Sequence, residues 1–243
     1  MNDLLIYFSH KYKGNNFEIF KALKNGESVN TNDLNNWKNI MSENQIEYIT
    51  IFDEIYPKEL KKAKYPPFVI YLKGNKELLK KNKIQIEADY VNDLCLKNLE
   101  KFKSILNSEH TLLISDFKGF NDVITIFCDD NKINKILILA QGIENFQKNW
   151  NYEDNLIISI YPAKTNPKYI RFKERNLLAS ELGKFLILLN SYQNSKLLNL
   201  VNYYLENNKE IYCFPGETYD DGNTELIKMG ATMITHFADI KYY

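Results

Sequence analysis

The sequence predicts an α/β protein whose central sheet is parallel and covered by helices on both faces. Short, continuous apolar runs such as residues 135–140 and 185–190 recur along the chain. Segments whose apolar residues fall at helical spacing, such as residues 91–106, separate these runs. This alternation is typical of βαβ units, and strands without a polar side indicate a sheet that is buried on both faces. Ligands of such sheets bind at the carboxyl ends of the strands, so we expect function in the loops that follow the strands.

The predicted elements follow one another in order from residue 83 onward. The expected strands are residues 83–88, 111–115, 135–140, 155–162, 185–190, 210–216 and 231–235. The expected helices are residues 91–106, a short amphipathic segment around Val123 and Phe127, and residues 173–182, 195–208 and 224–230. Gly183 directly follows one of these helices and is predicted to stop it as a C′ glycine.

The first 55 residues differ from the rest because they are polar and rich in asparagine. Residues 16–26 and 31–44 have helix-like patterns, and residues 52–75 form a proline-containing bridge into the sheet. We therefore predict a small helical N-terminal domain over residues 1–55 and the sheet domain over residues 56–243.

The charges are balanced overall but not locally. The chain of 243 residues has a formal net charge of zero, so its total charge does not indicate a nucleic-acid partner. Residues 161–184, however, contain four lysines and two arginines against two glutamates. Arg171 and Arg175 are the only arginines of the chain. A lysine-rich stretch is usually a solvated face, but arginines in a chain that otherwise uses lysine suggest a need for the guanidinium group.

Other features narrow the classes of function. Cys95, Cys128 and Cys213 are far apart and form no CxxC pair, so we expect reduced thiols in the core. The histidines lack the spacing of metal ligands, and no P-loop, GxSxG or HExxH motif occurs. The sequence shows no signal peptide and no apolar run long enough to span a membrane. We expect a cytoplasmic protein that is not an enzyme, with no metal, no cofactor and no membrane partner.

Five motifs resemble the DprA/Smf family of DNA-processing proteins. Residues 56–79 (YPKELKKAKYPPFVIYLKGNKELL) are similar to the family's YPxxL, PP and LYxKGNxxLL pattern. Residues 136–144 (ILILAQGIE) resemble AVLGxGID, and residues 172–176 (FKERN) resemble the start of FxxRNR. Residues 210–216 (EIYCFPG) resemble VFAVPG, and residues 221–231 (DGNTELIKMGA) resemble GxNxLIxxGA. The motifs keep the family's order.

The resemblance implies an extended Rossmann-like fold that binds single-stranded DNA. It also implies a homodimer that delivers a RecA-type recombinase onto DNA during transformation. Residues 225–237 (ELIKMGATMITHF), with Met229 and Ile234, supply an apolar surface suited to such a dimer. The family has no established enzymatic activity.

The sequence departs from the family at its glycine-rich loops. Residues 87–89 (EAD) stand in place of the family's GSR, and residues 195–197 (SKL) stand in place of SGS. Residues 115–125 keep only a serine, Lys118 and Gly119 of the pattern SGxAxGIDxxAH. Glycine loops bind phosphate because their bare backbone N–H groups approach the oxygens closely. We expect residues 87–89 to have lost much of this capacity, or to be only a connector.

Residues 168–176 are the best-preserved part of the predicted DNA-binding site. A single-strand binder needs positive charge along the backbone and aromatic faces for the bases. Arginine also offers a planar fork that holds two oxygens at once, which lysine does not. The candidate DNA-binding residues are Lys118, Gly119, Lys168, Tyr169, Arg171, Phe172, Lys173, Arg175 and Asn176.

Several alternatives stay open from the residues alone. Arg175 is expected either to hold DNA bidentately or to fix its helix N-terminus structurally, and Phe172 either to stack on a base or to belong to the core. The whole protein is, alternatively, a degenerate Rossmann-fold interaction module without DNA binding. A third alternative is a nucleotide-hydrolysing enzyme of a related fold, although residues 215–225 resemble its PGGxGTxxE loop poorly.

Overall fold

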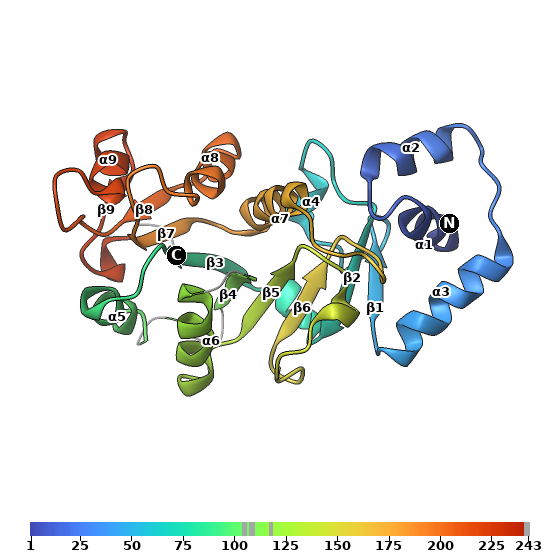
Figure 1. The fold of residues 1–243 in the computed structure, drawn as a ribbon, viewed down its shortest axis with the longest axis horizontal. Coiled ribbons are helices and arrows are strands. Elements are labelled where there is room, and N and C mark those ends of the chain that lie inside the picture. The colour runs from blue at the N-terminus through green and yellow to red at the C-terminus, as the bar shows by residue number, and fades with distance from the viewer. Residues whose placement is uncertain (104–105, 107–109, 117–118, 241–243) are drawn as a thin grey trace. The chain divides into compact units, whose positions relative to one another are not determined.

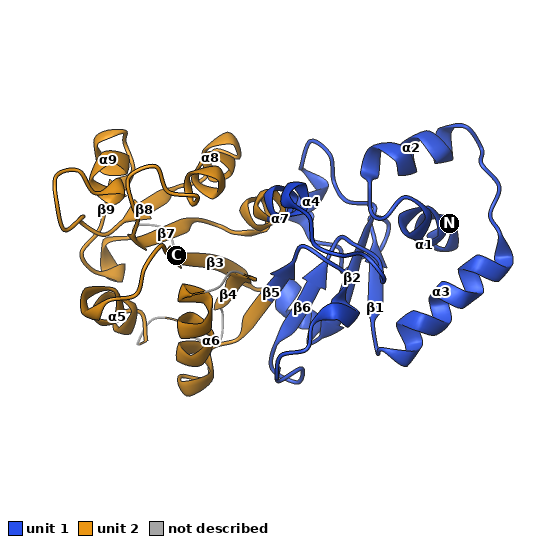
Figure 2. Cartoon of the chain, in the orientation of Figure 1, with its two compact units in different colours: residues 1–80, 137–175 blue, residues 81–136, 176–243 orange. Residues whose placement is uncertain are grey.

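The computed structural model describes residues 1–103, 106, 110–116 and 119–240 (Figure 1). The chain divides into two compact units (Figure 2). Unit 1 consists of residues 1–80 and 137–175, and unit 2 of residues 81–136 and 176–243.

Three helices open the chain: α1 (Asn2–Lys11), α2 (Asn16–Lys24) and α3 (Thr31–Glu43). The side chains of Asn15 and Asn30 each accept two backbone N–H groups at the starts of α2 and α3. Asparagine is a favoured N-cap residue because it satisfies N–H groups that the helix leaves unpaired. These caps explain how an asparagine-rich segment folds as helices, and they confirm the predicted helical N-terminal region. Helix α1 lies outside the two helical patterns expected from the sequence.

Helix α1 packs against strand β2 (Val69–Gly74) through a small polar and aromatic cluster. The Tyr71 hydroxyl donates to Ser9 Oγ over 2.9 Å. The His10 imidazole stacks on Trp37 with 4.9 Å between ring centroids and meets the Tyr71 ring edge-on at 5.7 Å. Burial lowers the pKa of His10 to about 4, because desolvation disfavours the charged imidazole.

The strands of unit 1 follow the order β1, β2, β6 and β5. Their bounds are Glu47–Thr50 for β1, Leu156–Ser159 for β6 and Lys135–Leu139 for β5, of which residues 137–139 belong to this unit. Strand β2 is antiparallel to both β1 and β6. This pairing was not expected from the sequence, which predicted only a bridge over residues 52–75. The bridge also contains the short helix α4 (Lys58–Lys61).

The strands of unit 2 follow the order β4, β3, β7, β8 and β9. They are His110–Ser115, Asn82–Ala88, Leu186–Asn190, Ile211–Cys213 and Thr232–Met233, in that order. Every neighbouring pair in this series is parallel. The side chains of β4 and β7 are buried along their whole length, as expected for a sheet covered on both faces.

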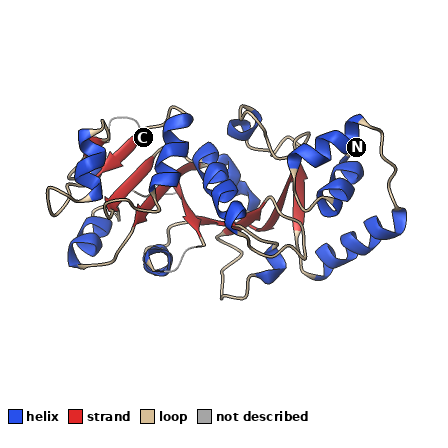
Figure 3. Ribbon diagram, turned by 45° about the horizontal axis from the view of Figure 1, so that its top comes forward, coloured by secondary structure: helices blue, strands red, loops and turns tan. Residues whose placement is uncertain are grey.

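Helices cover both faces of the sheet in unit 2 (Figures 1 and 3). Helices α5 (Asp93–Glu100) and α6 (Phe120–Asp130) lie on one face, and α8 (Leu198–Glu206) and α9 (Gly222–Lys228) lie on the other. This arrangement confirms the predicted α/β, Rossmann-like class. Three 3₁₀ turns complete the elements assigned within the described residues: Lys76–Lys80, Ile143–Asn145 and Phe237–Asp239.

Helix α7 (Tyr169–Leu182) starts in unit 1 and passes into unit 2 after Arg175. It begins at Tyr169, whereas the sequence predicted a start at Lys173. The C′ role predicted for Gly183 is wrong, because its φ is not among the positive values of the chain. A Cβ at this position would lie 2.1 Å from the Tyr204 hydroxyl oxygen. Glycine is therefore required by the close approach of α8 and not by backbone conformation.

The three cysteines are free and buried, as the sequence predicted. Burial raises the pKa of Cys95 to about 11 and the pKa values of Cys128 and Cys213 to about 12. Thiols of this kind are protonated at neutral pH and are poor nucleophiles. Among the described residues, no helix combines the length and apolar character needed to cross a membrane.

Candidate nucleic-acid interface

The carboxyl ends of β5 and β6 are tied together before α7 begins. Ser159, the last residue of β6, donates its hydroxyl to the backbone oxygen of Gln141 over 2.7 Å. The same hydroxyl oxygen accepts the backbone N–H of Tyr161 over 3.0 Å. The loop that leads from β6 to α7 is therefore fixed at its first residues.

A second set of contacts fixes this loop farther on. The Thr165 carbonyl accepts the Gly142 N–H over 2.9 Å, and Glu144 Oε1 accepts the Lys164 N–H. A Cβ on Gly142 would lie 2.5 Å from Glu144 Oε2 and 2.8 Å from the Pro162 oxygen. Glycine is thus needed for this approach. Sequence reasoning did not assign Glu144 a role, although it stands at the acid position of the GID-like motif.

Arg171 stacks on the loop that precedes its own helix. Its guanidinium carbon lies 5.0 Å from the centroid of the Tyr161 ring, and its Nη1 donates to the Asn166 carbonyl. The Tyr161 hydroxyl in turn donates to Glu174. Burial and the neighbouring Glu174 carboxylate raise the pKa of Tyr161 well above its usual value, so this hydroxyl remains a donor. Tyr161 and Glu174 were missed by sequence reasoning, and only the position of Tyr161 at a strand end could have indicated it.

Arg175 lies inside the protein. Its side chain has 0% exposure and is the largest fully buried side chain among the described residues. Its guanidinium carbon lies 5.3 Å from the centroid of the Phe172 ring. A planar guanidinium stacks on an aromatic face in a way that an ammonium does not. This burial favours the structural alternative for Arg175, and a contact between Arg175 and DNA is the alternative that a binding measurement tests.

The exposed part of the predicted site lies at the first turn of α7. Tyr169 is 77% exposed, and the Lys173 ammonium lies 5.1 Å from the centroid of its ring. Lys168 is exposed directly before the helix, while Phe172 and Lys173 are half-buried. Lys168, Tyr169 and Lys173 thus form a basic and aromatic surface, here called the α7 patch.

The remaining candidates lie in unit 2 or outside the described residues. Asn176 is buried, and its amide donates to Asn199 Oδ1 over 3.2 Å. Gly119 is exposed with φ +97° directly before α6, and a Cβ there would meet no atom within 4 Å. Lys118 lies outside the described residues.

The two acids that stand in place of the family's GSR loop accept hydrogen bonds from other residues of unit 2. Glu87 is buried and accepts the Gln85 amide over 2.8 Å. Asp89 Oδ2 accepts the backbone N–H of Tyr192 over 2.8 Å, and Asn190 Oδ1 accepts the Asp89 N–H over 3.1 Å. A carboxylate therefore takes a backbone N–H of the kind that binds phosphate in glycine-rich loops. These contacts favour the interpretation of this segment as a connector.

The loop before α9 is also internally satisfied. Asp221 caps the helix by accepting the Asn223 N–H over 2.8 Å. A Cβ on Gly222 would lie 2.4 Å from the Tyr192 oxygen, so this glycine serves close packing. No group of three or more potential metal ligands occurs within residues 1–103, 106, 110–116 and 119–240.

The two-unit α/β fold, with its series of parallel strands in unit 2 and helices on both faces, defines a Rossmann-like protein. The family model of the DNA recombination-mediator protein A matches residues 47–242, and the chain belongs to this family. It is 24% identical over 202 residues to the DNA processing protein DprA of Streptococcus pneumoniae, covering 79% of this chain and 72% of that protein.

Solved structures agree with the fold. The X-ray structure of DNA processing protein A from Streptococcus pneumoniae matches 100% of this chain and 99% of its own length, with a TM-score of 0.80 and 21% identity. DNA processing protein A from Helicobacter pylori, whose structure was described for its single-stranded DNA binding mode, matches 79% of this chain and 93% of its own length. Its TM-score is 0.67 and its identity 18%.

Proposed function

We propose that this DNA-processing protein binds single-stranded DNA in the cytoplasm, without sequence preference, through the α7 patch. The observation that carries the proposal is the Lys173 ammonium 5.1 Å from the centroid of the exposed Tyr169 ring, on the helix that bears the family's FxxRN motif. A base stacks on an aromatic face while its phosphates meet nearby ammonium groups. The single-stranded DNA binding of the Helicobacter pylori relative supports the same class of ligand.

We expect this protein to bind single-stranded DNA more weakly than a family member that keeps the glycine-rich loops. Glu87 and Asp89 leave little room for backbone capture of phosphate at the end of β3, since both carboxylates already accept hydrogen bonds. Lysine charge and stacking then supply most of the affinity. Such binding depends strongly on salt, because lysines release counterions from the strand.

A titration of fluorescein-labelled oligo-dT tests the proposal. Tyr169→Ala is expected to weaken binding about 5- to 100-fold, the scale of one lost stacking platform. Tyr219→Ala is the matched control, because Tyr219 is an exposed tyrosine of unit 2 outside the α7 patch. Equal affinities of the parent and Tyr169→Ala would contradict the proposal.

A RecA-type recombinase and a second copy of this chain are the partners that we propose for this function. Family membership supports both. For the homodimer, Met229 and Met233 are exposed around the short edge strand β9, whereas Ile234, also considered from the sequence, is buried in the core. Met229→Lys with Met233→Lys should shift sedimentation from a dimer to the 28.7 kDa monomer. The other partner is tested by measuring whether this protein speeds filament formation of a RecA-type protein on a single-stranded oligonucleotide.

A further inference from the structure

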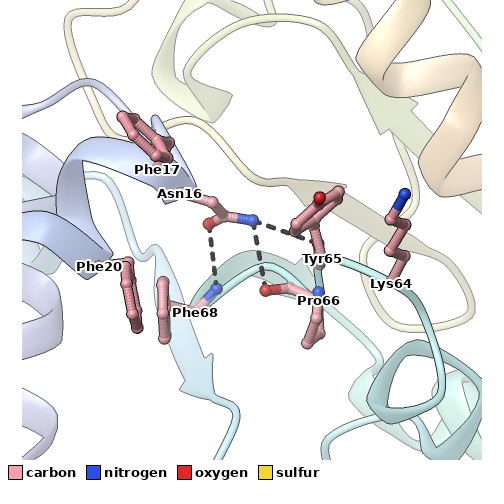
Figure 4. A pocket seen from close by; sticks show the side chains of 7 residues that line it. All are labelled: Asn16, Phe17, Phe20, Lys64, Tyr65, Pro66 and Phe68. Atoms are coloured by element: carbon pink, nitrogen blue, oxygen red, sulfur yellow. Dashed lines mark hydrogen bonds between the residues drawn. The ribbon is translucent and has the colours of Figure 1, made fainter.

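Unit 1 contains an aromatic groove that the α7 patch does not explain (Figure 4). One wall is helix α2, which contributes Phe17 and Phe20, and the other is the segment that leads into β2. The cavity has a volume of about 520 Å³. Its lining residues are Asn16, Phe17, Phe20, Lys64, Tyr65, Pro66 and Phe68, without an acidic side chain among them.

Three of the four rings that line this aromatic groove are exposed to solvent. Phe17 is 68% exposed, Phe20 55% and Tyr65 74%. The core face of α2 is formed instead by Ile19 and Ala22, which are buried. Phe17 and Phe20 are three residues apart and therefore share an exposed face of α2. Exposed apolar surface of this kind in a folded chain marks an interaction site.

Two lysine ammonium groups lie close to rings of the groove. Lys21 Nζ lies 5.9 Å from the centroid of the Phe17 ring, and Lys64 Nζ lies 5.4 Å from that of Tyr65. Residues 58–65 contain four lysines and one glutamate, all of them exposed, and α2 contains two lysines and one glutamate. The groove is thus bordered by positive charge on both walls, which fits a polyanion.

The polar groups of the groove are already paired. Asn16 Nδ2 donates to the carbonyls of Tyr65, over 3.4 Å, and Pro66, over 3.3 Å. Asn16 Oδ1 accepts the Phe68 N–H over 3.3 Å. A peptide that adds to a sheet as an extra strand needs free backbone groups on the protein. Here Asn16 already occupies the backbone groups of Tyr65, Pro66 and Phe68. The groove offers ring faces and charge, which is what a sequence-tolerant binder of single strands uses.

The segment that leads into α2 packs against the loop that precedes α7. A Cβ on Gly14, two residues before Asn16, would lie 2.5 Å from the Ile160 oxygen and 3.3 Å from the Tyr161 ring. Gly14 also has φ +78°, so both its conformation and its packing require glycine. Since Tyr161 is the ring on which Arg171 stacks, the groove and the start of α7 are anchored to the same loop of unit 1.

We propose that the aromatic groove is a second site for single-stranded DNA, in which bases stack on Phe17, Phe20 and Tyr65 while Lys21 and Lys64 contact phosphates. The proposal rests on the proposed function, because both sites take the same ligand. A strand that is long enough engages both sites and gains affinity from the second. A short strand occupies one site at a time.

Oligo-dT of about 6 and about 20 nucleotides, titrated into the full chain, tests this proposal, since single-strand sites span several nucleotides. The variant Phe17→Ala with Phe20→Ala should weaken binding of the long strand about 5-fold or more and remove most of the affinity gained with length. Phe52→Ala is the control, because Phe52 is an exposed phenylalanine of unit 1 followed by two acids. It should bind both strands like the parent.

A crosslinking measurement on the parent protein avoids any effect of substitution on folding. An oligonucleotide with 5-iodouracil, irradiated in the complex and followed by peptide mass spectrometry, should label residues 16–20 or 64–68 in addition to residues 168–173. Labels confined to residues 168–173 would overturn the second site and leave the proposed function standing. A parent that binds neither strand would overturn both.

The remaining outcomes identify another occupant. If the Phe17 and Phe20 variant keeps the parent's DNA affinity but sediments as a smaller species, the groove holds a second copy of the chain. If it keeps both the affinity and the sedimentation of the parent, a protein partner is the occupant that remains. Either result overturns the DNA site.

Discussion

The guanidinium carbon of Arg175 lies 5.3 Å from the centroid of the Phe172 ring, inside the protein, where the arginine has no exposed surface. Arg171 stands in the same relation to Tyr161, at 5.0 Å. The two arginines of a lysine-rich chain thus both stack on aromatic rings. Stacking explains the choice of arginine at both positions, because a guanidinium is planar and more weakly hydrated than an ammonium.

Arg175→Lys should lower stability and not DNA affinity. The lysine loses the stack on Phe172 and the fixed fork, and it brings a strongly hydrated ammonium into the core. We expect a loss of about 1–3 kcal/mol in the free energy of unfolding, the scale of hydrogen bonds to a charged group. Thermal melting and oligo-dT titration of the same variant check this. A variant with the parent's melting temperature but weakened binding would show that Arg175 reaches DNA.

Lys168→Ala and Lys173→Ala should show the opposite pattern. Neither lysine is buried, so both variants should melt like the parent. Each should reduce the slope of log K against log salt by about 0.7, the value for one phosphate contact on a single strand. Lys97→Ala is a control, because Lys97 is an exposed lysine of α5. An unchanged slope in both variants would exclude the α7 patch as the path of the backbone.

His10 should make the protein less stable in mild acid. Its pKa is about 4 in the folded protein, against 6.5 in the unfolded chain, so the unfolded state binds more protons between these values. Stability is therefore full above pH 6.5 and falls as the pH drops towards 4, by up to about 3 kcal/mol. Denaturant unfolding of the parent and of His10→Phe at pH 7 and pH 4.5 checks the difference.

The matched control for that comparison is His236→Gln, because His236 is exposed in unit 2. His10→Phe should remove most of the extra loss of stability at the lower pH, while His236→Gln should retain it. Equal losses in the parent and in His10→Phe would mean that other groups carry the acid sensitivity.

Lys209 should stabilise the end of α7. Its Nζ donates to the carbonyls of Ser180 and Glu181 over 2.6 Å and to that of Gly183 over 2.5 Å. The Lys209 ammonium thus satisfies carbonyls at the end of α7, where Gly183 does not form a left-handed cap. Lys209→Met should lower the free energy of unfolding by about 1–3 kcal/mol. Lys184→Met, at an exposed lysine beside the same helix end, should cost much less.

Strands were more predictable from the sequence than the site was. Residues 112–114 and 185–189 are continuously apolar, and short runs of this kind are typical of strands that are buried on both faces. The start of α7 was missed because Lys168, Tyr169 and Ile170 show no apolar period. The antiparallel pairing of β2 depends on contacts distant in sequence, which no local pattern encodes.

The burial of Arg175 could not be predicted because arginine is normally a surface residue. It depends on a ring one turn away in the helix and on the surrounding packing. The aromatic groove was missed for the opposite reason. Phe17 and Phe20 look like core residues in the sequence, while the structure uses Ile19 and Ala22 for that purpose.

The hydrogen bond from the Tyr192 amide to Asp89 has a consequence for how this protein responds to its ligand. Because the Tyr192 amide already has an anionic partner, the loop after β7 is held in place without DNA. Its exchange with deuterated solvent should be slow in the free protein and should not slow further when DNA is added. Protection that depends on DNA should instead appear around α7. The counter-charge for this amide is thus supplied by the protein's own Asp89 carboxylate, whether or not DNA is bound.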